Sequence, residues 1–314
     1  DGASIVYISH FLEEVCAIAD RWTVLRDGKS VAEGAMEGTT NNTLIEAMTG
    51  RPLDEIFPKR TPKMGGVRLR AENISGIDRP SSASIDVRRG EIIGLSGLVG
   101  GGRTEFLRVL AGLDPMKGGT LSIDGNDVPP SASVKQRLVY GCGLLSEDRK
   151  GEGLALSMSI AVNMLLSRLG TATSMWFLRS PQMTAQSNQL IERLGVKVSD
   201  AWDAVGTLSG GNQQKVALAR LLHQEASVLF LDEPTRGIDV GSKVQIYRLL
   251  DQLALAGCSI VVSSGYAPEL LGLCDRIAVM HRGVLGPLRA AGECSEASLM
   301  REAVFGSNEK ECVA

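Results

Sequence analysis

Short apolar blocks separated by polar turns predict an α/β protein. Residues 91–96 and 228–231 are almost wholly apolar, which is typical of strands buried on both faces of a parallel sheet. A helical pattern at residues 105–111 follows the first of these strands. We therefore expect a doubly wound sheet, with ligands at the carboxyl ends of its strands.

The same order of elements occurs near both ends of the chain. Asp20-Arg21 matches Asp275-Arg276, and Leu44 matches Leu299, at an offset of about 255 positions. Shared order and spacing predict an internal repeat at domain scale. The expected strand, helix, strand and closing helix lie at residues 4–8, 11–19, 22–25 and 43–48, and again at residues 259–264, 269–274, 275–280 and 299–303.

A proline- and glycine-rich segment at residues 51–66 separates the two copies, and its composition predicts a linker. We expect residues 1–50 to be the tail of a first domain whose front part is absent. Residues 67–306 form a second, complete copy on this interpretation, and residues 307–314 are a terminal tail. The first residue is Asp1 rather than Met, which favours a fragment.

Composition and charge exclude some classes of function. The 33 Lys and Arg residues against 36 Asp and Glu residues give a net charge of −3, which argues against a nucleic-acid binder held by phosphate neutralisation. No apolar run reaches the ~18 residues of a membrane span, and the opening does not have the pattern of a signal peptide. Six cysteines without a Cys-x-x-Cys pair, together with three histidines, disfavour a zinc site or a disulfide framework.

A glycine-rich segment joins the strand at residues 91–96 to the helix at residues 105–111. Strand, loop and helix are the context of a phosphate-binding loop, whose backbone N–H groups turn toward phosphate oxygens. Thr104 offers a hydroxyl to Mg²⁺, whereas Arg103 stands where the motif has Lys and keeps the charge without the compact ammonium. The candidate nucleotide-binding residues are Gly97, Leu98, Val99, Gly100, Gly101, Gly102, Arg103 and Thr104.

Two acidic residues follow the apolar strand at residues 228–231. They are expected near the phosphates, because the carboxyl ends of the strands lie there. Asp232 is the candidate ligand of Mg²⁺, and Glu233 is the candidate base that polarises the attacking water. A solvated acidic turn is the alternative interpretation of this pair taken alone.

A third motif, Leu-Ser-Gly-Gly-Asn-Gln-Gln, starts at residue 208 and precedes a helix. Ser209 is a candidate N-cap, and Gly210 and Gly211 expose backbone amides at the helix start, which predicts a second anion site. An ordinary capped helix explains Ser-Gly-Gly alone. It does not explain three such motifs in this order.

The three motifs in this order resemble the nucleotide-binding domain of ABC transporters. Residues 97–104 resemble Walker A, residues 229–233 resemble Walker B, and residues 208–213 resemble the highly specific ABC signature. The resemblance implies an α/β P-loop NTPase fold with a helical subdomain, at about residues 154–205, and an antiparallel β subdomain. It also implies nucleotide contacts by Glu147 in the Q-loop position, by Leu208, Ser209, Gly210, Gly211 and Gln213 of the signature, and by Asp239 of the D-loop.

A narrower resemblance concerns the ATPase subunits of monosaccharide importers, of the ribose, galactose and xylose type. It rests on two fused domains, on Gly-Arg-Thr in the second Walker A, and on Ser-Glu-Asp-Arg-Lys at residues 146–150. It implies ATP and Mg²⁺ as cofactors, transmembrane permease subunits as partners and, indirectly, a periplasmic sugar-binding protein. A second ATPase copy or the absent first half is a further expected partner, nucleic acid is not, and the expected location is the cytoplasmic face of the inner membrane.

The family sandwiches ATP between the Walker A of one half and the signature of the other. His10 matches the switch histidine, so His10 and this chain's signature complete one competent site with residues that are absent here. Ser264 is aligned with His10 in the second copy, where the following stretch is about one residue longer. Because the second site has Arg103 and Ser264 in these positions, we expect it to bind ATP and to hydrolyse it slowly, if at all.

Two other interpretations stay open at this point. A soluble ABC ATPase that acts on ribosomes or DNA has the same motifs. A non-catalytic regulatory module is also compatible, because the chain alone completes no consensus site. Hydrolysis by the chain alone is expected to be weak or absent.

Overall fold

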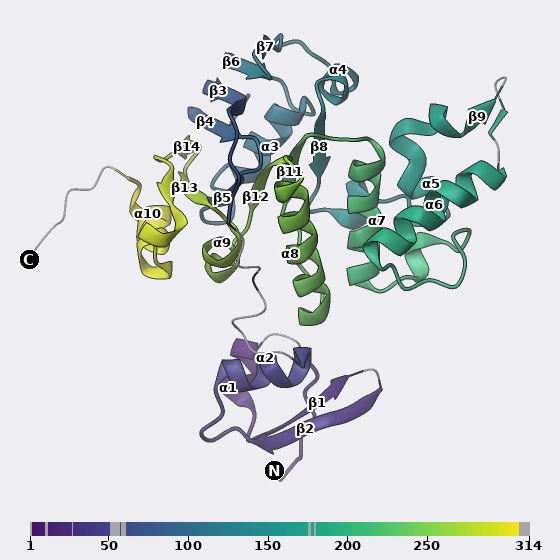
Figure 1. The fold of residues 1–314 in the computed structure, drawn as a ribbon. Coiled ribbons are helices and arrows are strands. Elements are labelled where there is room, and N and C mark those ends of the chain that lie inside the picture. Colours follow the sequence, from purple (N-terminus) through teal and green to yellow (C-terminus); the bar gives the residue numbers. More distant parts are fainter. Residues whose placement is uncertain are drawn as a thin grey trace, which may run out of the picture.

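The fold is described by a computed structural model over residues 2–9, 12–26, 28–50, 57, 61–174, 177–178 and 180–307. A small N-terminal unit is followed by a larger unit that starts at residue 67 (Figure 1). None of the helices within these ranges is long and apolar enough to cross a membrane.

The N-terminal unit is a helix, a β-hairpin and a second helix. Strands β1 (Arg21–Arg26) and β2 (Lys29–Ala35) pair antiparallel between α1 (Leu12–Ile18) and α2 (Asn41–Thr49). The strand expected at residues 4–8 is wrong: Ile5, Val6 and Ile8 are 85%, 90% and 91% exposed. A strand needs a neighbour for its backbone hydrogen bonds, and the described residues offer this segment none.

A seven-stranded sheet forms the centre of the larger unit. Five of its strands are parallel, and four of these five lie at strands predicted from the sequence. The short β15 (Arg289–Ala290) pairs antiparallel with β13. In spatial order the other strands are β14 (Val284–Leu285), β13 (Arg276–His281), β5 (Ile92–Ser96), β12 (Ser259–Ser263), β11 (Val228–Asp232) and β8 (Cys142–Leu145).

Alternate residues of these strands face two hydrophobic clusters, one on each side of the sheet. Ile92 and Leu229 belong to one cluster, and their neighbours Ile93 and Phe230 belong to the other. The first side carries α7 (Gly210–His223), α8 (Val240–Leu255), α9 (Ala267–Leu273) and α10 (Glu296–Phe305). The second side carries α3 (Arg103–Ala111) and an antiparallel sheet of β4 (Ala83–Arg88), β3 (Val67–Ser75), β6 (Gly118–Ile123) and β7 (Asn126–Asp127).

A helical part projects beside α7 (Figure 1). It includes α5 (Ile160–Leu165) and α6 (Ser180–Leu194), both within the segment expected to be the helical subdomain. The remaining elements are α4 (Val134–Val139), the paired β9 (Thr173–Ser174) and β10 (Phe177–Leu178), and short helical turns at Arg149–Gly153, Leu166–Ala172, Val205–Thr207 and Ala291–Glu293.

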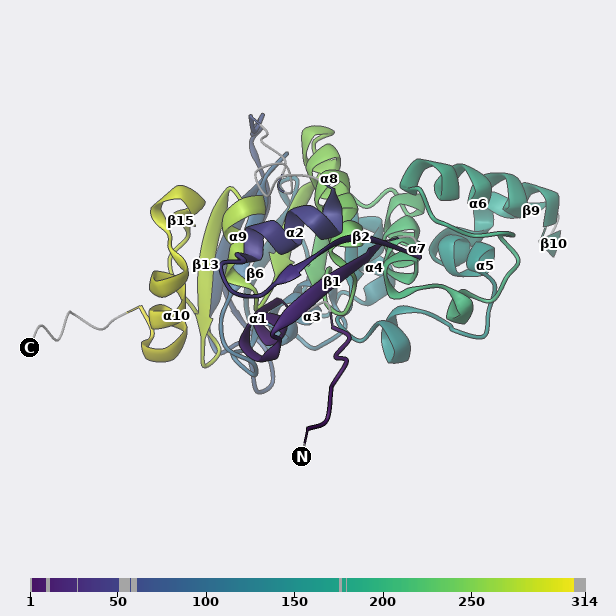
Figure 2. The same cartoon turned by 90° about the horizontal axis from the view of Figure 1, so that it is seen from below.

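The two units touch at α8 and α9, where the N-terminal unit lies in both views (Figures 1 and 2). Ile45 of α2 packs against the hydrophobic cluster that α8 and α9 share. The Phe57 ring stacks on Tyr247 of α8, with ring centroids 5.1 Å apart, and it also covers Gly272 of α9.

Candidate functional site

The phosphate-loop candidate lies between β5 and α3, as the sequence predicted. Two of its glycines are required by geometry. A Cβ on Gly97, whose φ is 148°, would lie 2.4 Å from the Met280 carbonyl oxygen. Gly102 precedes α3 with a φ of 110°, a backbone conformation that L side chains rarely adopt. The Val99 side chain is 98% exposed, so it is not held by packing against the rest of the protein.

The predicted carboxylates lie at the end of β11. Asp232 is the last residue of that strand and is 3% exposed. Glu233 follows with a φ of 47°, and its N–H donates to the Ser263 carbonyl at 2.9 Å. This left-handed residue redirects the chain at the carboxyl edge of the sheet, so that the Glu233 side chain leaves the strand direction.

The Glu233 carboxylate meets the phosphate-loop arginine. Its Oε1 lies 3.3 Å from Arg103 Nη2 and accepts the Gly265 N–H at 2.7 Å. Burial raises the pKa of Glu233, while the Arg103 charge and the Gly265 hydrogen bond oppose that rise. The sequence placed Arg103 and Glu233 in one site, but it did not predict that they pair with each other.

A hollow of about 530 Å³ collects residues from several predicted motifs. Thr104, Glu147 and Glu233 line it, and Glu147 forms an ion pair with Arg236. Gln214 also lines the hollow and was missed by the sequence reasoning, although it follows the predicted Gln213 directly. Oxygen donors such as the Thr104 hydroxyl and the Asp232 carboxylate suit Mg²⁺. The described residues contain no cluster of three or more His, Cys, Asp or Glu side chains that would hold a metal by themselves.

The signature residues form the start of α7. Ser209 stands at the N-cap position, but its side chain makes no capping bond, which corrects that expectation. Its hydroxyl instead accepts from Asn212 Nδ2 at 3.1 Å, and the residue is exposed. The first N–H groups of α7 are therefore not capped by Ser209. Gln213 turns inward and donates to the Leu208 carbonyl at 3.1 Å, so its nucleotide contact stays a prediction.

Asp239 caps α8 beside the signature. It accepts from the Ser242 N–H at 2.9 Å and from the Ser242 hydroxyl at 2.7 Å. Burial alone would raise the pKa of Asp239, but the hydrogen bonds from Ser242 and from the backbone of Asp239 and Gly241 together outweigh it, and the pKa is lowered. Gly211 allows the close approach of α7 and α8, because a Cβ there would lie 2.1 Å from Ser242 Oγ.

The structure changes the alignment of the two repeat copies. Ser264 Oγ donates to Glu269 Oε2 at 2.5 Å, and Ser9 Oγ donates to Glu14 Oε2 at 3.3 Å. Each glutamate lies five residues after its serine, and both pairs have the offset of the repeat. Ser264 therefore corresponds to Ser9 rather than to His10.

The residue that corresponds to His10 is Gly265, and the extra residue inferred after Ser264 is not needed. His10 itself lies outside the described residues. Ser264 is 1% exposed, and its hydroxyl donates to Glu269 rather than pointing to the hollow. The predicted contact between Ser264 and nucleotide therefore stays a prediction.

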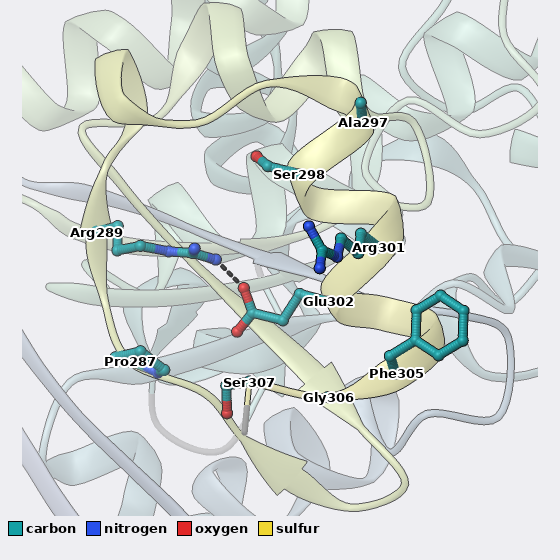
Figure 3. A pocket seen from close by; sticks show the side chains of 9 residues that line it. All are labelled: Pro287, Arg289, Ala297, Ser298, Arg301, Glu302, Phe305, Gly306 and Ser307. Atoms are coloured by element: carbon teal, nitrogen blue, oxygen red, sulfur yellow. Dashed lines mark hydrogen bonds and ion pairs between the residues drawn. The ribbon is translucent and has the colours of Figure 1, made fainter. Parts of the chain in front are cut away.

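A second hollow, of about 460 Å³, lies beside α10 and contains none of the predicted site residues (Figure 3). The Arg289 and Glu302 side chains form an ion pair inside it. It is a separate surface feature, and the candidate nucleotide site is the hollow next to Thr104.

A phosphate loop, strand-end carboxylates and a signature helix on one parallel sheet define a P-loop NTPase of the ATP-binding cassette type. Residues 81–236 match the family model described as ABC transporter. The chain belongs to this family, as the identities to its curated relatives show.

The "Ribose import ATP-binding protein RbsA" of Pseudomonas putida is 41% identical over 300 residues, which are 96% of this chain and 58% of that protein. The "Putative ribose/galactose/methyl galactoside import ATP-binding protein 1" of Rhizobium etli is 42% identical over 306 residues, which are 97% of this chain and 58% of that protein. The chain thus spans less than two thirds of the length of these relatives.

Solved structures confirm the fold. A nucleotide-free ATP-binding cassette from an ABC transporter superposes with a TM-score of 0.67 and 19% identity, covering 78% of this chain and all of that one. The ADP conformation of another ABC transporter cassette gives a TM-score of 0.63, also at 19% identity, and covers 77% of this chain and 96% of the other. The expected P-loop NTPase fold is confirmed.

Proposed function

We propose that this chain is part of the ATPase subunit of an ABC importer for a monosaccharide, and that it binds MgATP at the loop of residues 97–104. The observation that carries the proposal is the hollow in which Thr104, Glu147 and Glu233 meet at the carboxyl edge of the sheet. The relatives' names, which specify ribose or galactose import, support the substrate class.

The proposed roles follow from the chemistry of each group. Backbone N–H groups of the loop and the N-terminus of α3 bind the phosphates, and Thr104 and Asp232 hold Mg²⁺, which neutralises phosphate charge. In hydrolysis the water oxygen bonds to the γ-phosphorus, the bond to the β-phosphate oxygen breaks, and ADP leaves. The water proton moves to a carboxylate, and Glu233 is the residue placed for this step.

The signature serves the other site of the subunit in this proposal. Ser209 is exposed at the start of α7, so this end of the helix is available to a nucleotide held by another ATPase half. That half would include residues 1–50 and His10, with residues 51–66 as the linker to residues 67–306. The second site is then the slower one, because it has Arg103 in the loop and no histidine at residues 264 or 265.

Partners and location complete the proposal. Transmembrane permease subunits would bind the helical part at residues 154–205, and a periplasmic sugar-binding protein would act through them. The subunit would lie on the cytoplasmic face of the inner membrane. Purification of the complete subunit from its native membrane tests this: a co-purifying multi-span permease supports it, whereas co-purifying ribosomes would favour the soluble ATPase class.

Calorimetric titration of MgATP into this chain tests the binding site. We expect one nucleotide per chain, and about tenfold weaker binding for Thr104→Ala in the presence of Mg²⁺, since a charge-assisted contact is lost. The matched control is Thr120→Ala, an exposed threonine of β6. No binding at millimolar ATP would contradict the proposal and favour a regulatory module.

A further inference from the structure

The carboxylate of Glu233 is held by two groups at once. Arg103 Nη2 lies 3.3 Å from Oε1, and the Gly265 N–H donates to the same oxygen at 2.7 Å. The Glu233 side chain is only 17% exposed, so water screens this contact weakly. Glu233 Oε1, the oxygen that faces the phosphate-loop arginine, therefore already has two partners.

The backbone around these groups fixes the arrangement. The Glu233 N–H bonds to the Ser263 carbonyl, and the Ser264 N–H bonds to the Leu95 carbonyl at 3.2 Å, so neighbouring strand ends are tied together. The Ser264 hydroxyl and the Thr235 hydroxyl both donate to the buried Glu269 carboxylate, at 2.5 and 2.7 Å. Gly265 therefore follows an anchored residue.

The arginine is as constrained as the glutamate. The Arg103 side chain is 9% exposed, and its Nη1 is buried without a hydrogen-bond partner in the described part of the chain. A guanidinium presents a planar fork of donors that can contact two oxygen groups together. A phosphate oxygen would supply the acceptor that Arg103 Nη1 does not have.

We propose that Arg103 and the Gly265 N–H clamp Glu233, and that this clamp retains nucleotide while it withholds the base from the attacking water. Gly265, rather than Ser264, is the position at which a side chain decides whether this site hydrolyses ATP. Arg103 and Gly265 act through Glu233 and are positioning residues. The inference rests on the proposed nucleotide site.

A side chain at residue 265 would have room, and its Cβ would lie next to Glu233 and Arg103. A Cβ built on Gly265 would lie 3.4 Å from Glu233 Oε1 and 3.7 Å from Arg103 Nη2, both ordinary contacts. An imidazole there would reach the region of Glu233 with one donor and one acceptor nitrogen. A side chain at residue 264, in contrast, would lie among the buried hydroxyl groups that bond to Glu269.

The decisive experiment measures ATP hydrolysis by the complete subunit, with Ser209→Arg blocking the site that this chain's signature closes. In that background we expect Arg103→Lys/Gly265→His to raise turnover at least about tenfold, because the lysine frees Glu233 from the arginine and the imidazole adds an acid–base group next to it. Adding Glu233→Gln should abolish the gain. The matched control Arg103→Lys/Ser264→His should give at most the smaller gain that comes from releasing Glu233 from Arg103 alone.

A gain in the Ser264→His variant without one in the Gly265→His variant would overturn the proposal, as would a gain in neither while both bind ATP. The clamp is also tested without nucleotide, by amide hydrogen exchange of Gly265 in this chain. We expect faster exchange in Glu233→Ala and no change in Glu72→Ala, an exposed carboxylate of β3. Unchanged exchange in Glu233→Ala overturns the clamp even if ATP binds, whereas failure to bind ATP counts only against the proposed function.

Discussion

At the residue scale, the residue type at several site positions is determined by the space that a neighbouring side chain needs. Gly211 is the clearest case, because Ser242 occupies the volume of any side chain there. Gly211 is buried, so its presence in the signature has a structural reason in addition to the predicted anion contact. The glycine sets how closely the signature helix approaches α8.

Gly211→Ala should destabilise the fold by about 1–3 kcal/mol, because a Cβ forced against Ser242 Oγ overpacks the contact between α7 and α8. Urea unfolding measures the free energy. Gly292→Ala is the control, since nothing lies within 4 Å of its Cβ. A Gly211→Ala protein as stable as this control would refute the close approach.

At the element scale, the start of α8 depends on one charge. Asp239 satisfies the Ser242 N–H of the first turn and also accepts from the Ser242 hydroxyl, and its negative charge suits the helix N-terminus. The D-loop region is therefore a helix cap as well as a candidate nucleotide contact.

Asp239→Asn should reduce the free energy of unfolding by roughly 0.5–1 kcal/mol at neutral pH. The folded pKa of Asp239 is lowered from 3.8, so the charged form stabilises the fold above that pH, and the contribution disappears as pH falls through the folded value. Urea unfolding from pH 7 to pH 3 should show the two proteins converging at the acid end. Asp78→Asn, an exposed carboxylate, is the control, and a difference that grows toward acid would exclude this explanation.

The elements of the larger unit could be predicted because each motif is local. Four of the five parallel strands, the phosphate loop and the signature helix follow from runs of residues that are close in sequence, whereas β8 was not predicted. The strand at residues 4–8 was mispredicted, because a strand exists only with its neighbour. The match of Gly265 with His10 needed the serine–glutamate bonds, which spacing alone does not reveal. The pairing of Arg103 with Glu233 joins two distant motifs and is a tertiary contact.

At the scale of the whole molecule, Phe57 joins the N-terminal unit to the larger one. Its ring stacks on Tyr247 and lies over Gly272, where a Cβ would come within 2.5 Å of the ring. The absence of a side chain at Gly272 thus leaves the space in which the Phe57 ring packs. Tyr247 beside it is 2% exposed, so the ring rests on the core.

Phe57→Ala should lower the free energy of unfolding by about 1–2 kcal/mol, because a partly buried ring is lost. It should also speed tryptic cleavage at the nearby Lys59 and Arg60. Gly272→Ala should have the same effects, since its methyl group displaces the ring. In the Phe57→Ala background the same Gly272→Ala change should be neutral or stabilising, and destabilisation there would contradict the contact.

The Phe57 contact also limits how far the two units can separate. A chain spans at most about 3.5 Å per residue, so Gly50 at the end of α2 stays within about 25 Å of an anchored Phe57. Without that anchor the limit is set by the start of β3 and rises to about 55–60 Å. A shorter tether raises the effective concentration of one unit at the other. One aromatic side chain thereby tunes how often the N-terminal unit meets the larger unit.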